Sequence, residues 1–334
     1  MAVRDLPESP IANRKSPITD SCGGWLANPR TIGTVFGALG MVSFSLTLPA
    51  TRAAVLHLHP AVVAFGRPII AAILAGALLI VTGQRPPDRR YWKSFLLIVI
   101  GVVVGVPLTF AWGMHALPSA HGAITLGLLP LGTALVATMR ASERPSKRFW
   151  AASLVGSAAV LVFAWINGAG HIQAGDFILL LSVAASALGY AEGARVAREI
   201  PGWQVMSWAL VFGAPLHIIP LALAIRAHGL SGAPPSAWAA FAYVCLISQW
   251  LGMFAWYKGL AAGGIARIGQ LQLLQPFCTF AFAAILLGET ITVPMLVAAM
   301  VVLAAVAVAR NAPVELRHGY AVNIPPDFAS NDSE

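Results

Sequence analysis

"LQLLQPFCTFAFAAILLGET", residues 271–290, is the stretch that decides the fold class of this chain. It is apolar over nearly its whole length, with glutamines around Pro276 near its start and Glu289 at its end. A helix needs about 20 predominantly apolar residues to cross a lipid bilayer. The stretch therefore predicts a membrane-spanning helix that carries a few polar groups into the hydrocarbon region.

The composition of the whole chain agrees with this interpretation. Hydrophobic residues make up 58% of the sequence and charged residues 10%, with a mean hydropathy of +0.76. A soluble globular chain has about 25% charged residues, so a soluble protein is excluded. Membrane β-strands would alternate apolar and polar residues over short segments, and this sequence does not. We expect an all-α membrane protein.

Long intervals without a charged residue indicate how often the chain crosses the membrane. One such interval lies between Arg30 and Arg52, and the interval from Lys93 to Arg140 is long enough for two spans. The expected transmembrane helices are ten, at residues 32–55, 61–82, 92–115, 120–139, 149–167, 174–197, 203–227, 236–258, 264–287 and 290–309.

The net charge of +8 is explained by orientation in the membrane and does not indicate nucleic-acid binding. With a cytoplasmic N-terminus, most of the 21 Lys and Arg residues fall in cytoplasmic segments, which is the positive-inside pattern. Arg52 and Arg226 fall outside, and Arg67 lies within the second helix. We expect a multi-pass inner-membrane protein with both termini in the cytoplasm, residues 1–31 forming a disordered tail and 310–334 a second tail.

Neither the cysteines nor the histidines predict a metal site or a cofactor. Cys22, Cys245 and Cys278 are scattered, without the spacing of metal ligands or a disulfide framework. Histidines such as His57 and His59 gather in segments expected outside, where capping or packing explains them better than zinc transport. An enzyme would need His, Asp, Glu or Cys residues clustered at one depth, and the sequence predicts no such cluster.

The opening stretch has a counterpart earlier in the chain. In residues 125–143, Pro130 is followed thirteen positions later by Glu143, as Pro276 is by Glu289. The tripeptide Phe-Ala-Trp precedes both stretches, at residues 110–112 and 254–256. These markers predict two five-helix repeats, at 32–167 and 174–309. Because five is odd, the second repeat has the opposite orientation, an arrangement typical of secondary transporters with a mid-membrane site.

The chain resembles the drug/metabolite transporter superfamily in its EamA-type, ten-helix form. The resemblance rests on "LLPLGTALVATMRASE" and "LLQPFCTFAFAAILLGET", each followed by a further apolar helix. It extends to exporters of aromatic amino acids and methyl viologen. It implies a basket of helices around a central cavity, with the fifth and tenth helices peripheral and often at the contact of a homodimer.

The eighth and ninth helices supply most candidate substrate contacts. Polar and aromatic side chains share a face in "SQWLGMFAWYKG", and two glutamines three residues apart share a face of the next helix. An aromatic belt at the membrane interface and hydrogen bonds between helices are the alternatives. The candidate substrate-binding residues are Trp112, His115, Tyr190, Gln249, Trp250, Met253, Trp256, Tyr257, Lys258, Gln272 and Gln275.

Charged residues within or next to the helices are candidates for coupling or charge recognition, because a buried charge must pair or face water. Arg67, Glu192 and Arg267 are these candidates. The alternatives are a structural pair for Arg67, an ion pair with Arg195 for Glu192, and snorkelling to the interface for Arg267 and Lys258. Glu143 and Glu289, on opposite sides of the membrane, are expected to accept backbone donors of the next helix.

Together these features predict an inner-membrane secondary transporter that exports small amphipathic metabolites by alternating access. Amino acids, especially aromatic ones, are the favoured substrates, and flat organic cations are the second class. A carrier for phosphorylated or nucleotide-linked sugars is one alternative, which would need several basic residues in the cavity. A non-transporting membrane receptor or scaffold is the other. The expected partners are the small-molecule substrate and the bilayer.

Overall fold

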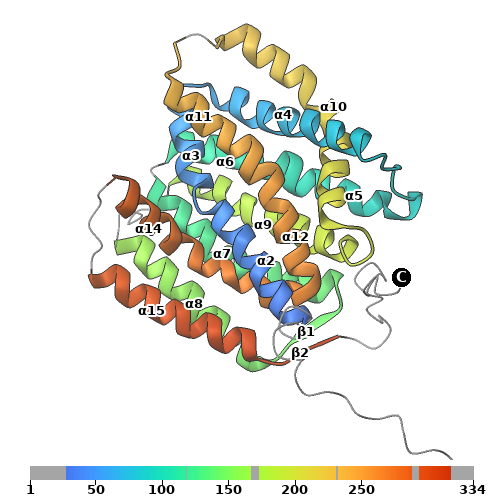
Figure 1. Ribbon diagram of the computed structural model, residues 1–334. Coiled ribbons are helices and arrows are strands. Elements are labelled where there is room, and N and C mark those ends of the chain that lie inside the picture. The colour runs from blue at the N-terminus through green and yellow to red at the C-terminus, as the bar shows by residue number, and fades with distance from the viewer. Residues whose placement is uncertain (1–27, 118, 167–172, 231, 288–292, 317–334) are drawn as a thin grey trace, which may run out of the picture.

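The computed structural model describes residues 28–117, 119–166, 173–230, 232–287 and 293–316. Within these ranges the chain is a bundle of long helices with one small two-stranded sheet (Figure 1). This confirms the predicted all-α class. Four residues were predicted to mark the repeats: Pro130, Glu143, Pro276 and Glu289. Of these, Glu289 lies outside the described residues.

The first half contains the following elements: α2 (Pro29–Phe44), α3 (Thr47–Val55), α4 (Pro60–Val81), η1 (Arg89–Tyr91), α5 (Trp92–Ile98), the π-helix η2 (Val99–Gly105), α6 (Val106–Ala116), α7 (Ser119–Arg140), β1 (Glu143–Pro145) and α8 (Lys147–Ile166). The second half contains α9 (Ala174–Val196), α10 (Gly202–His228), α11 (Pro235–Tyr243), the π-helix η3 (Val244–Leu251), α12 (Gly252–Gly263), α13 (Ile265–Gly269), η4 (Gln270–Leu274), α14 (Gln275–Leu287), α15 (Val293–Asn311) and β2 (Val314–Leu316).

Eight helical segments of the described chain are long and apolar enough to cross a membrane. A shorter apolar helix covers Thr125–Arg140 within α7, and the predicted ninth span is divided into α13, η4 and α14. Pro276 explains why the ninth span is not one regular α-helix. It has no backbone N–H to donate, and its ring clashes with the carbonyl of Gln272 four residues earlier. The exact count of ten spans stays a prediction.

Close helix contacts join the two halves. Helix α2 packs along α12, and a Cβ atom added at Gly33 would lie 2.4 Å from the Cα atom of Gly263. Helix α9 of the second half packs in the same way against η2 and α6 of the first, where Gly101 meets Gly189. Helices α4 and α10 pair with each other, as do α8 and α15. Two related halves packed face to face would make these contacts.

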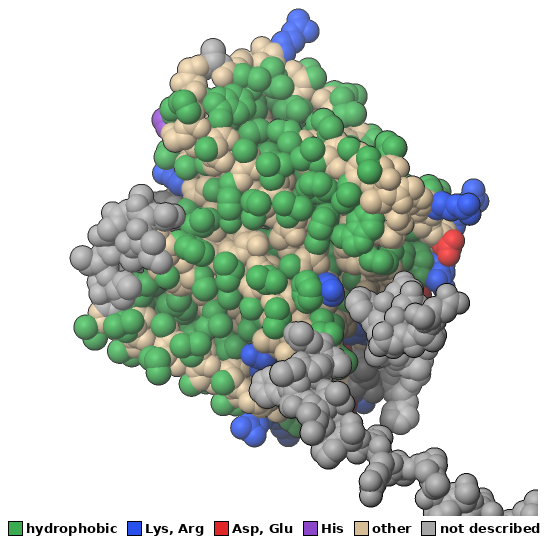
Figure 2. All heavy atoms as spheres, in the orientation of Figure 1, with side chains coloured by type: hydrophobic (Ala, Val, Ile, Leu, Met, Phe, Trp, Pro, Cys, Tyr) green, Lys and Arg blue, Asp and Glu red, His purple; other side chains and the backbone are tan. Residues whose placement is uncertain are grey.

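The outer surface suits a lipid environment. Hydrophobic side chains cover most of the face in Figure 2, and the Lys and Arg side chains visible there lie mainly toward its margins. Large apolar side chains of the outer helices, among them Leu223 of α10 and Met300 of α15, are exposed. Exposing so much apolar surface to water would be unfavourable, so these side chains are suited to contact lipid.

Both ends of the described chain lie at one end of the bundle, which we call the sheet end. The Arg310 Nη2 atom near the end of α15 donates to Thr34 Oγ1 of α2 at 2.5 Å, and β1 pairs antiparallel with β2 (Figure 1). The predicted even number of membrane crossings would place both ends on the same side. Residues 314–316, expected in a terminal tail, form a strand instead because the loop after α7 offers them a partner.

Candidate substrate cavity

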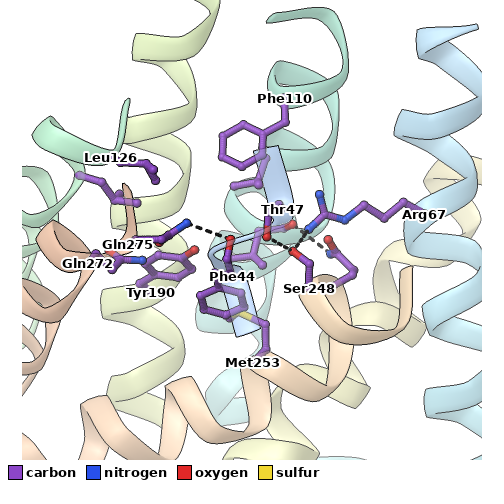
Figure 3. A pocket seen from close by; sticks show the side chains of 14 residues that line it. Phe44, Thr47, Arg67, Phe110, Leu126, Tyr190, Ser248, Met253, Gln272 and Gln275 are labelled. Atoms are coloured by element: carbon purple, nitrogen blue, oxygen red, sulfur yellow. Dashed lines mark hydrogen bonds between the residues drawn. The ribbon is translucent and has the colours of Figure 1, made fainter. Parts of the chain in front are cut away.

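A small cavity lies between the two halves, deep within the bundle (Figure 3). Polar and apolar side chains from eleven helical elements line it, and each half contributes several. The lining residues are Phe44, Thr47, Arg67, Val102, Val106, Phe110, Leu126, Leu129, Tyr190, Ser248, Gln249, Met253, Gln272 and Gln275.

A break in the first span places two of these residues. Sequence analysis predicted a continuous helix over 32–55, but α2 ends at Phe44 and α3 begins at Thr47. Pro49 explains the break, because it cannot bond to the carbonyl of Ser45 and its ring crowds that group. Side chains of the second half satisfy the freed carbonyls: Gln275 Nε2 donates to Phe44 O at 3.0 Å, and Thr279 Oγ1 donates to Ser45 O.

Two π-helices, one in each half, also border the cavity. The π-helices η2 and η3 start 145 residues apart, close to the offset of the two Phe-Ala-Trp tripeptides. A π-helix loosens the regular hydrogen-bond ladder and is common at functional sites. Here the two meet, because Gln249 Nε2 of η3 donates to Val102 O of η2 at 3.2 Å. No sequence pattern predicted either π-helix.

Arg67 is the charged side chain of the lining. It extends from α4 and is 4% exposed, with its Nη2 atom donating to Ser248 Oγ at 3.0 Å (Figure 3). The Ser248 hydroxyl shares a second hydrogen bond of 2.8 Å with Thr47 Oγ1. The Arg67 Nε atom has no hydrogen-bond partner among the described residues. The guanidinium is therefore held in place by a neutral hydroxyl.

Glutamine oxygens add unused acceptors to the site. Gln249 and Gln272 are each 1% exposed, and the Oε1 atom of each has no hydrogen-bond partner within the described chain. In the view of Figure 3, Gln272, Gln275 and Tyr190 lie on the side of the cavity opposite Arg67. A buried acceptor without a donor is costly, so these oxygens are suited to bind a ligand that brings N–H groups.

The rest of the lining is apolar and partly aromatic. Phe44, Phe110, Leu126 and Met253 present rings and aliphatic groups to the cavity (Figure 3). Trp256 is fully buried behind them, with edge-on ring contacts to Phe44 at 5.9 Å and to Tyr190 at 5.6 Å. The site thus combines one fixed cation, several hydrogen-bonding groups and an apolar wall.

The structure brings together part of the predicted set. Arg67, Tyr190, Gln249, Met253, Gln272 and Gln275 line the cavity. Trp256 and Tyr257 lie behind the lining, and the Tyr257 hydroxyl donates to Gly189 O at 3.1 Å. Whether any of these residues binds substrate stays a prediction.

The remaining candidates lie away from the lining. Trp112 is 36% exposed on the outer surface of α6, beside Phe65, and His115 is exposed near the end of that helix. Trp250 donates to Ser207 Oγ at 3.2 Å, on another side of η3. The face on which each of these side chains lies depends on how its helix is oriented about its own axis, and the sequence pattern does not reveal that orientation.

The two basic candidates next to the eighth and ninth helices also lie elsewhere. Lys258 Nζ lies 3.9 Å from the centre of the Phe36 ring, and Arg267 Nη2 is 3.5 Å from Ala312 O near the sheet end. Neither belongs to the cavity lining.

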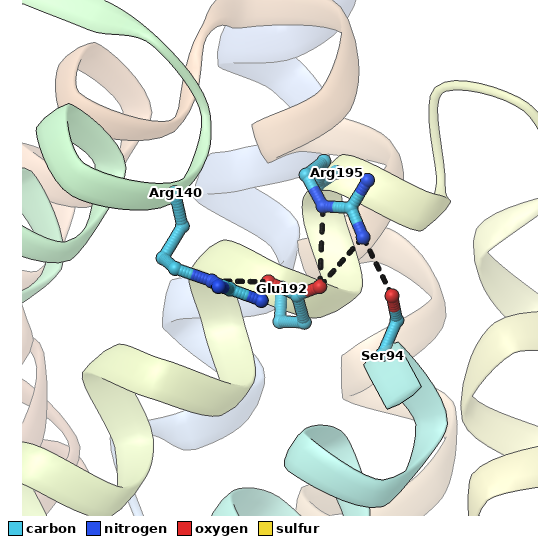
Figure 4. A network of polar contacts seen from close by, with 4 residues as sticks. All are labelled: Ser94, Arg140, Glu192 and Arg195. Carbon is cyan, nitrogen blue, oxygen red and sulfur yellow. Dashed lines mark hydrogen bonds and ion pairs between the residues drawn. The ribbon is translucent and has the colours of Figure 1, made fainter. Parts of the chain in front are cut away.

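Glu192 belongs to an ion-pair network near the sheet end (Figure 4). It is fully buried, and its carboxylate accepts hydrogen bonds from Arg140 Nε at 3.2 Å and from Arg195 Nη2 at 2.7 Å. Arg195 Nη2 also donates to Ser94 Oγ at 2.5 Å. The network ties α7, α9 and α5 together, which agrees with the structural alternative for Glu192.

Glu143 caps a helix of the other half. Its two carboxylate oxygens accept the backbone N–H groups of Ile265 and Ala266, each at 2.9 Å, and Arg198 Nη2 lies 2.7 Å from Oε1. The expectation of a helix-end role is met at a different helix, because the donors belong to α13 and not to α8, the next helix along the chain. The packing of the halves places the start of α13 beside this carboxylate.

Sequence reasoning missed several lining residues. Thr47 and Ser248 looked like ordinary small polar residues, and Val106 and Leu129 like helix packing. The signal that could have indicated Thr47 is Pro49, which predicts a break in the first span. Within the described ranges, His, Cys, Asp and Glu form no group of three or more that could hold a metal ion.

Comparisons with known proteins agree with this architecture. The model of the EamA-like transporter family matches residues 31–165 and again 173–310. The chain is 42% identical over 284 residues to the protein named "Uncharacterized transporter YdeK" from Bacillus subtilis, covering 85% of this chain and 99% of the relative. It is 26% identical over 227 residues to the "Probable amino-acid metabolite efflux pump" of Salmonella typhimurium, covering 62% and 75%.

A solved structure titled "Crystal structure of protein" has the same fold. It superimposes with a TM-score of 0.68 at 19% sequence identity, covering 84% of this chain and 99% of that one.

Proposed function

Because this chain belongs to the EamA-like transporter family, we propose that it is an inner-membrane secondary transporter that exports small amphipathic metabolites by alternating access. It is a multi-pass membrane transporter, and its relatives are named as transporters and an efflux pump. Amino acids, especially aromatic ones, are the favoured substrate class, and flat organic cations are the second. The name of the Salmonella relative supports the first class.

The observation that carries the proposal is the central cavity. Its lining comes from both halves of the chain and joins a buried cation and amide groups to aromatic and aliphatic side chains. Such a lining suits a small molecule with one polar end and one apolar end. A cavity between two halves is also where alternating-access carriers hold their substrate.

Alternating access has support from the relation between the halves. The family model matches the chain twice, and each half carries a π-helix that borders the cavity. Rocking of one half against the other would expose the cavity to each side in turn. The broken first span, with its carbonyls bonded to the ninth, is a point at which such motion could bend the bundle.

The alternatives fit less well. A phosphorylated sugar carries about 1.5 to 2 negative charges at neutral pH, whereas Arg67 is the one basic residue among the described lining residues. A non-transporting receptor or scaffold would not need two related halves with a cavity between them. The homodimer that the family resemblance implies stays a prediction.

Transport by purified protein in liposomes tests the proposal. Labelled L-phenylalanine and labelled methyl viologen should be tested for uptake, with a broad panel of amino acids and organic cations as competitors. We expect uptake of at least one labelled solute above that of empty liposomes, with saturation and competition. Failure of every solute to be taken up or to compete would contradict the proposed substrate classes.

Orientation is tested separately by labelling single cysteines in intact cells. Arg144 at the sheet end and Arg226 at the end of α10 are both exposed, so a cysteine at either position is accessible to a reagent. In a chain whose own cysteines are replaced, Arg226→Cys should react with an impermeant maleimide from outside. Arg144→Cys should react only after the cells are opened. The reverse pattern would overturn the predicted cytoplasmic location of the sheet end.

A further inference from the structure

Arg67, a buried cation without a counter-ion among the described residues, is the feature that the proposed function leaves unexplained. An arginine side chain stays charged in proteins and has five N–H donors. Arg67 is 4% exposed, and its one hydrogen bond to a described residue goes to the neutral Ser248 hydroxyl. An uncompensated charge in a low-dielectric interior is strongly unfavourable. The free energy of this site would therefore fall on binding of an anion.

The described acidic residues all have partners or positions outside the cavity lining. Glu143 and Glu192 pair with arginines near the sheet end, Asp88 and Glu199 pair with Arg90, Asp176 caps α9 and Glu315 lies in β2. None of the ion pairs among the described residues includes Arg67. Because no described residue supplies the counter-charge, a molecule that enters the cavity is suited to supply it.

The neighbours of Arg67 indicate how much negative charge a bound molecule would carry. The guanidinium presents a planar fork that matches a carboxylate in two parallel hydrogen bonds. The lining residues that the structure describes include no second Lys or Arg, so one negative charge is neutralised and a second is not. The free oxygens of Gln249 and Gln272 can accept the N–H groups of an ammonium. Phe110, Leu126 and Met253 can contact an apolar side chain.

We infer that Arg67 is a specificity-determining residue, which binds a single carboxylate of the substrate and repels organic cations. This inference rests on the proposed function and narrows it: substrates carry one carboxylate beside an apolar group, with or without an ammonium. Ser248, itself bonded to Thr47, holds the guanidinium at the edge of the cavity. Flat dications are excluded, because the aromatic lining cannot offset the repulsion from a fixed positive charge in a low-dielectric site.

Three phenyl compounds of similar shape and one flat dication test the inference on the purified full-length protein. L-Phenylalanine and 3-phenylpropionate carry a carboxylate, L-phenylalaninamide has an ammonium without one, and methyl viologen is a flat dication. Binding is measured as the ligand-induced rise in the thermal unfolding midpoint, and transport as liposome uptake of each labelled probe. We expect the two carboxylates to bind and the two cations to have no effect.

Variants assign the selectivity to the side chain. Arg67→Gln should weaken carboxylate binding about tenfold or more, as expected for loss of a charged hydrogen-bond donor. Arg67→Lys keeps the charge and should retain the preference for carboxylates with reduced affinity. Arg226→Gln is the matched control, because Arg226 is an exposed arginine of α10, outside the lining, and it should bind like the wild type.

The outcomes separate this inference from the proposed function. Binding of the cations as strongly as the carboxylates, absence of carboxylate binding, or unchanged binding by Arg67→Gln would each overturn the role of Arg67. In the first of these cases, uptake of the cations would leave the proposed transport function standing. Carboxylate binding that depends on Arg67, without uptake of any probe, would support the inference and count against the proposed transport function. The wild-type comparison does not depend on the folding of any variant.

Discussion

The central cavity and the sheet end both bury charged side chains, yet they treat the charges in opposite ways. At the sheet end, Glu143 has Arg198 and two backbone N–H groups as partners, and Glu192 has two arginines. In the cavity, Arg67 has one neutral hydroxyl, and nearby glutamine oxygens accept nothing from the described residues.

The difference predicts which of these charges are structural and which one is functional. A buried carboxylate with all its partners holds helices together, because removing any partner leaves a charge exposed to a low dielectric. A buried cation without a counter-ion adds no such tie, and it lowers its own free energy when a ligand brings the missing charge. We therefore expect variants at the sheet end to lose stability and variants in the cavity to lose transport.

The largest effect is expected at Glu143. Replacing Glu143 with alanine removes the cap of α13 and leaves Arg198 without its carboxylate, so the free energy of unfolding should fall by about 3–5 kcal/mol. Thermal or denaturant unfolding in detergent measures the change. Glu199→Gln is the matched control near the same end, because the Glu199 side chain is 45% exposed. Its pair with Arg90 should contribute about 1 kcal/mol or less. Equal losses for both variants would contradict a special structural role for Glu143.

Arg67→Met should show the reverse pattern. It removes a buried charge that has no counter-ion among the described residues, so we expect the free energy of unfolding to stay the same or to rise. Uptake of the carboxylate substrate should nevertheless fall about tenfold or more. Both quantities can be measured on the same preparation. A loss of stability as large as that of Glu143→Ala would place Arg67 among the structural charges and break the comparison.

A smaller effect is expected for Gln272→Leu, which keeps approximately the volume of the side chain. The variant removes the proposed acceptor for the substrate ammonium, so the KM for an amino acid should rise about tenfold, the low end of the effect of one hydrogen bond to a charged group. The KM for 3-phenylpropionate, which has no ammonium, should change little. Uptake kinetics for both solutes, with unfolding as a control, measure the difference. An equal rise in KM for both solutes would contradict a contact between Gln272 and the substrate ammonium.

The smallest effect concerns pH at the end opposite the sheet. His59 stacks on His228 with ring centres 3.5 Å apart, and its Nδ1 atom accepts the N–H of Ala61 at 3.2 Å. Desolvation, with the nearby His228 and His115, lowers the pKa of His59 below its ordinary value of 6.5. The folded state therefore favours the neutral ring, so this contribution to stability is complete above pH 6.5 and falls as the pH drops below that value.

Unfolding midpoints measured across that pH range test this contribution. His59→Asn keeps an acceptor at the start of α4 and removes the titrating group, so it should flatten the dependence slightly. An unchanged pH profile in this variant would assign the effect to other groups.

The sequence predicted the helices better than the cavity. Hydropathy and charge placed the helical segments, because burial in lipid demands long apolar runs whatever the neighbouring helices are. Gln272 and Gln275 could be singled out for the same reason, since a polar group in such a run needs an explanation. Trp112 shows the limit: its type suited a binding surface, yet it lies on the outer face of α6. Which side chains face the cavity depends on the orientation of each helix about its axis and on the π-helices. Both are set by packing against other helices.

The amino-acid sequence by itself determined an all-α membrane protein, because composition and apolar run length depend on each segment alone. It also indicated the relation between the halves, through Pro130, Glu143 and Pro276. Only the tertiary structure decided which polar groups meet. Glu143 became a cap for α13, and Arg67 came to face a cavity without a carboxylate, because contacts between the halves join residues that lie 122 positions apart in one case and 181 in the other. Whether a buried charge has a partner depends on such contacts between distant residues, and a local sequence pattern does not predict them.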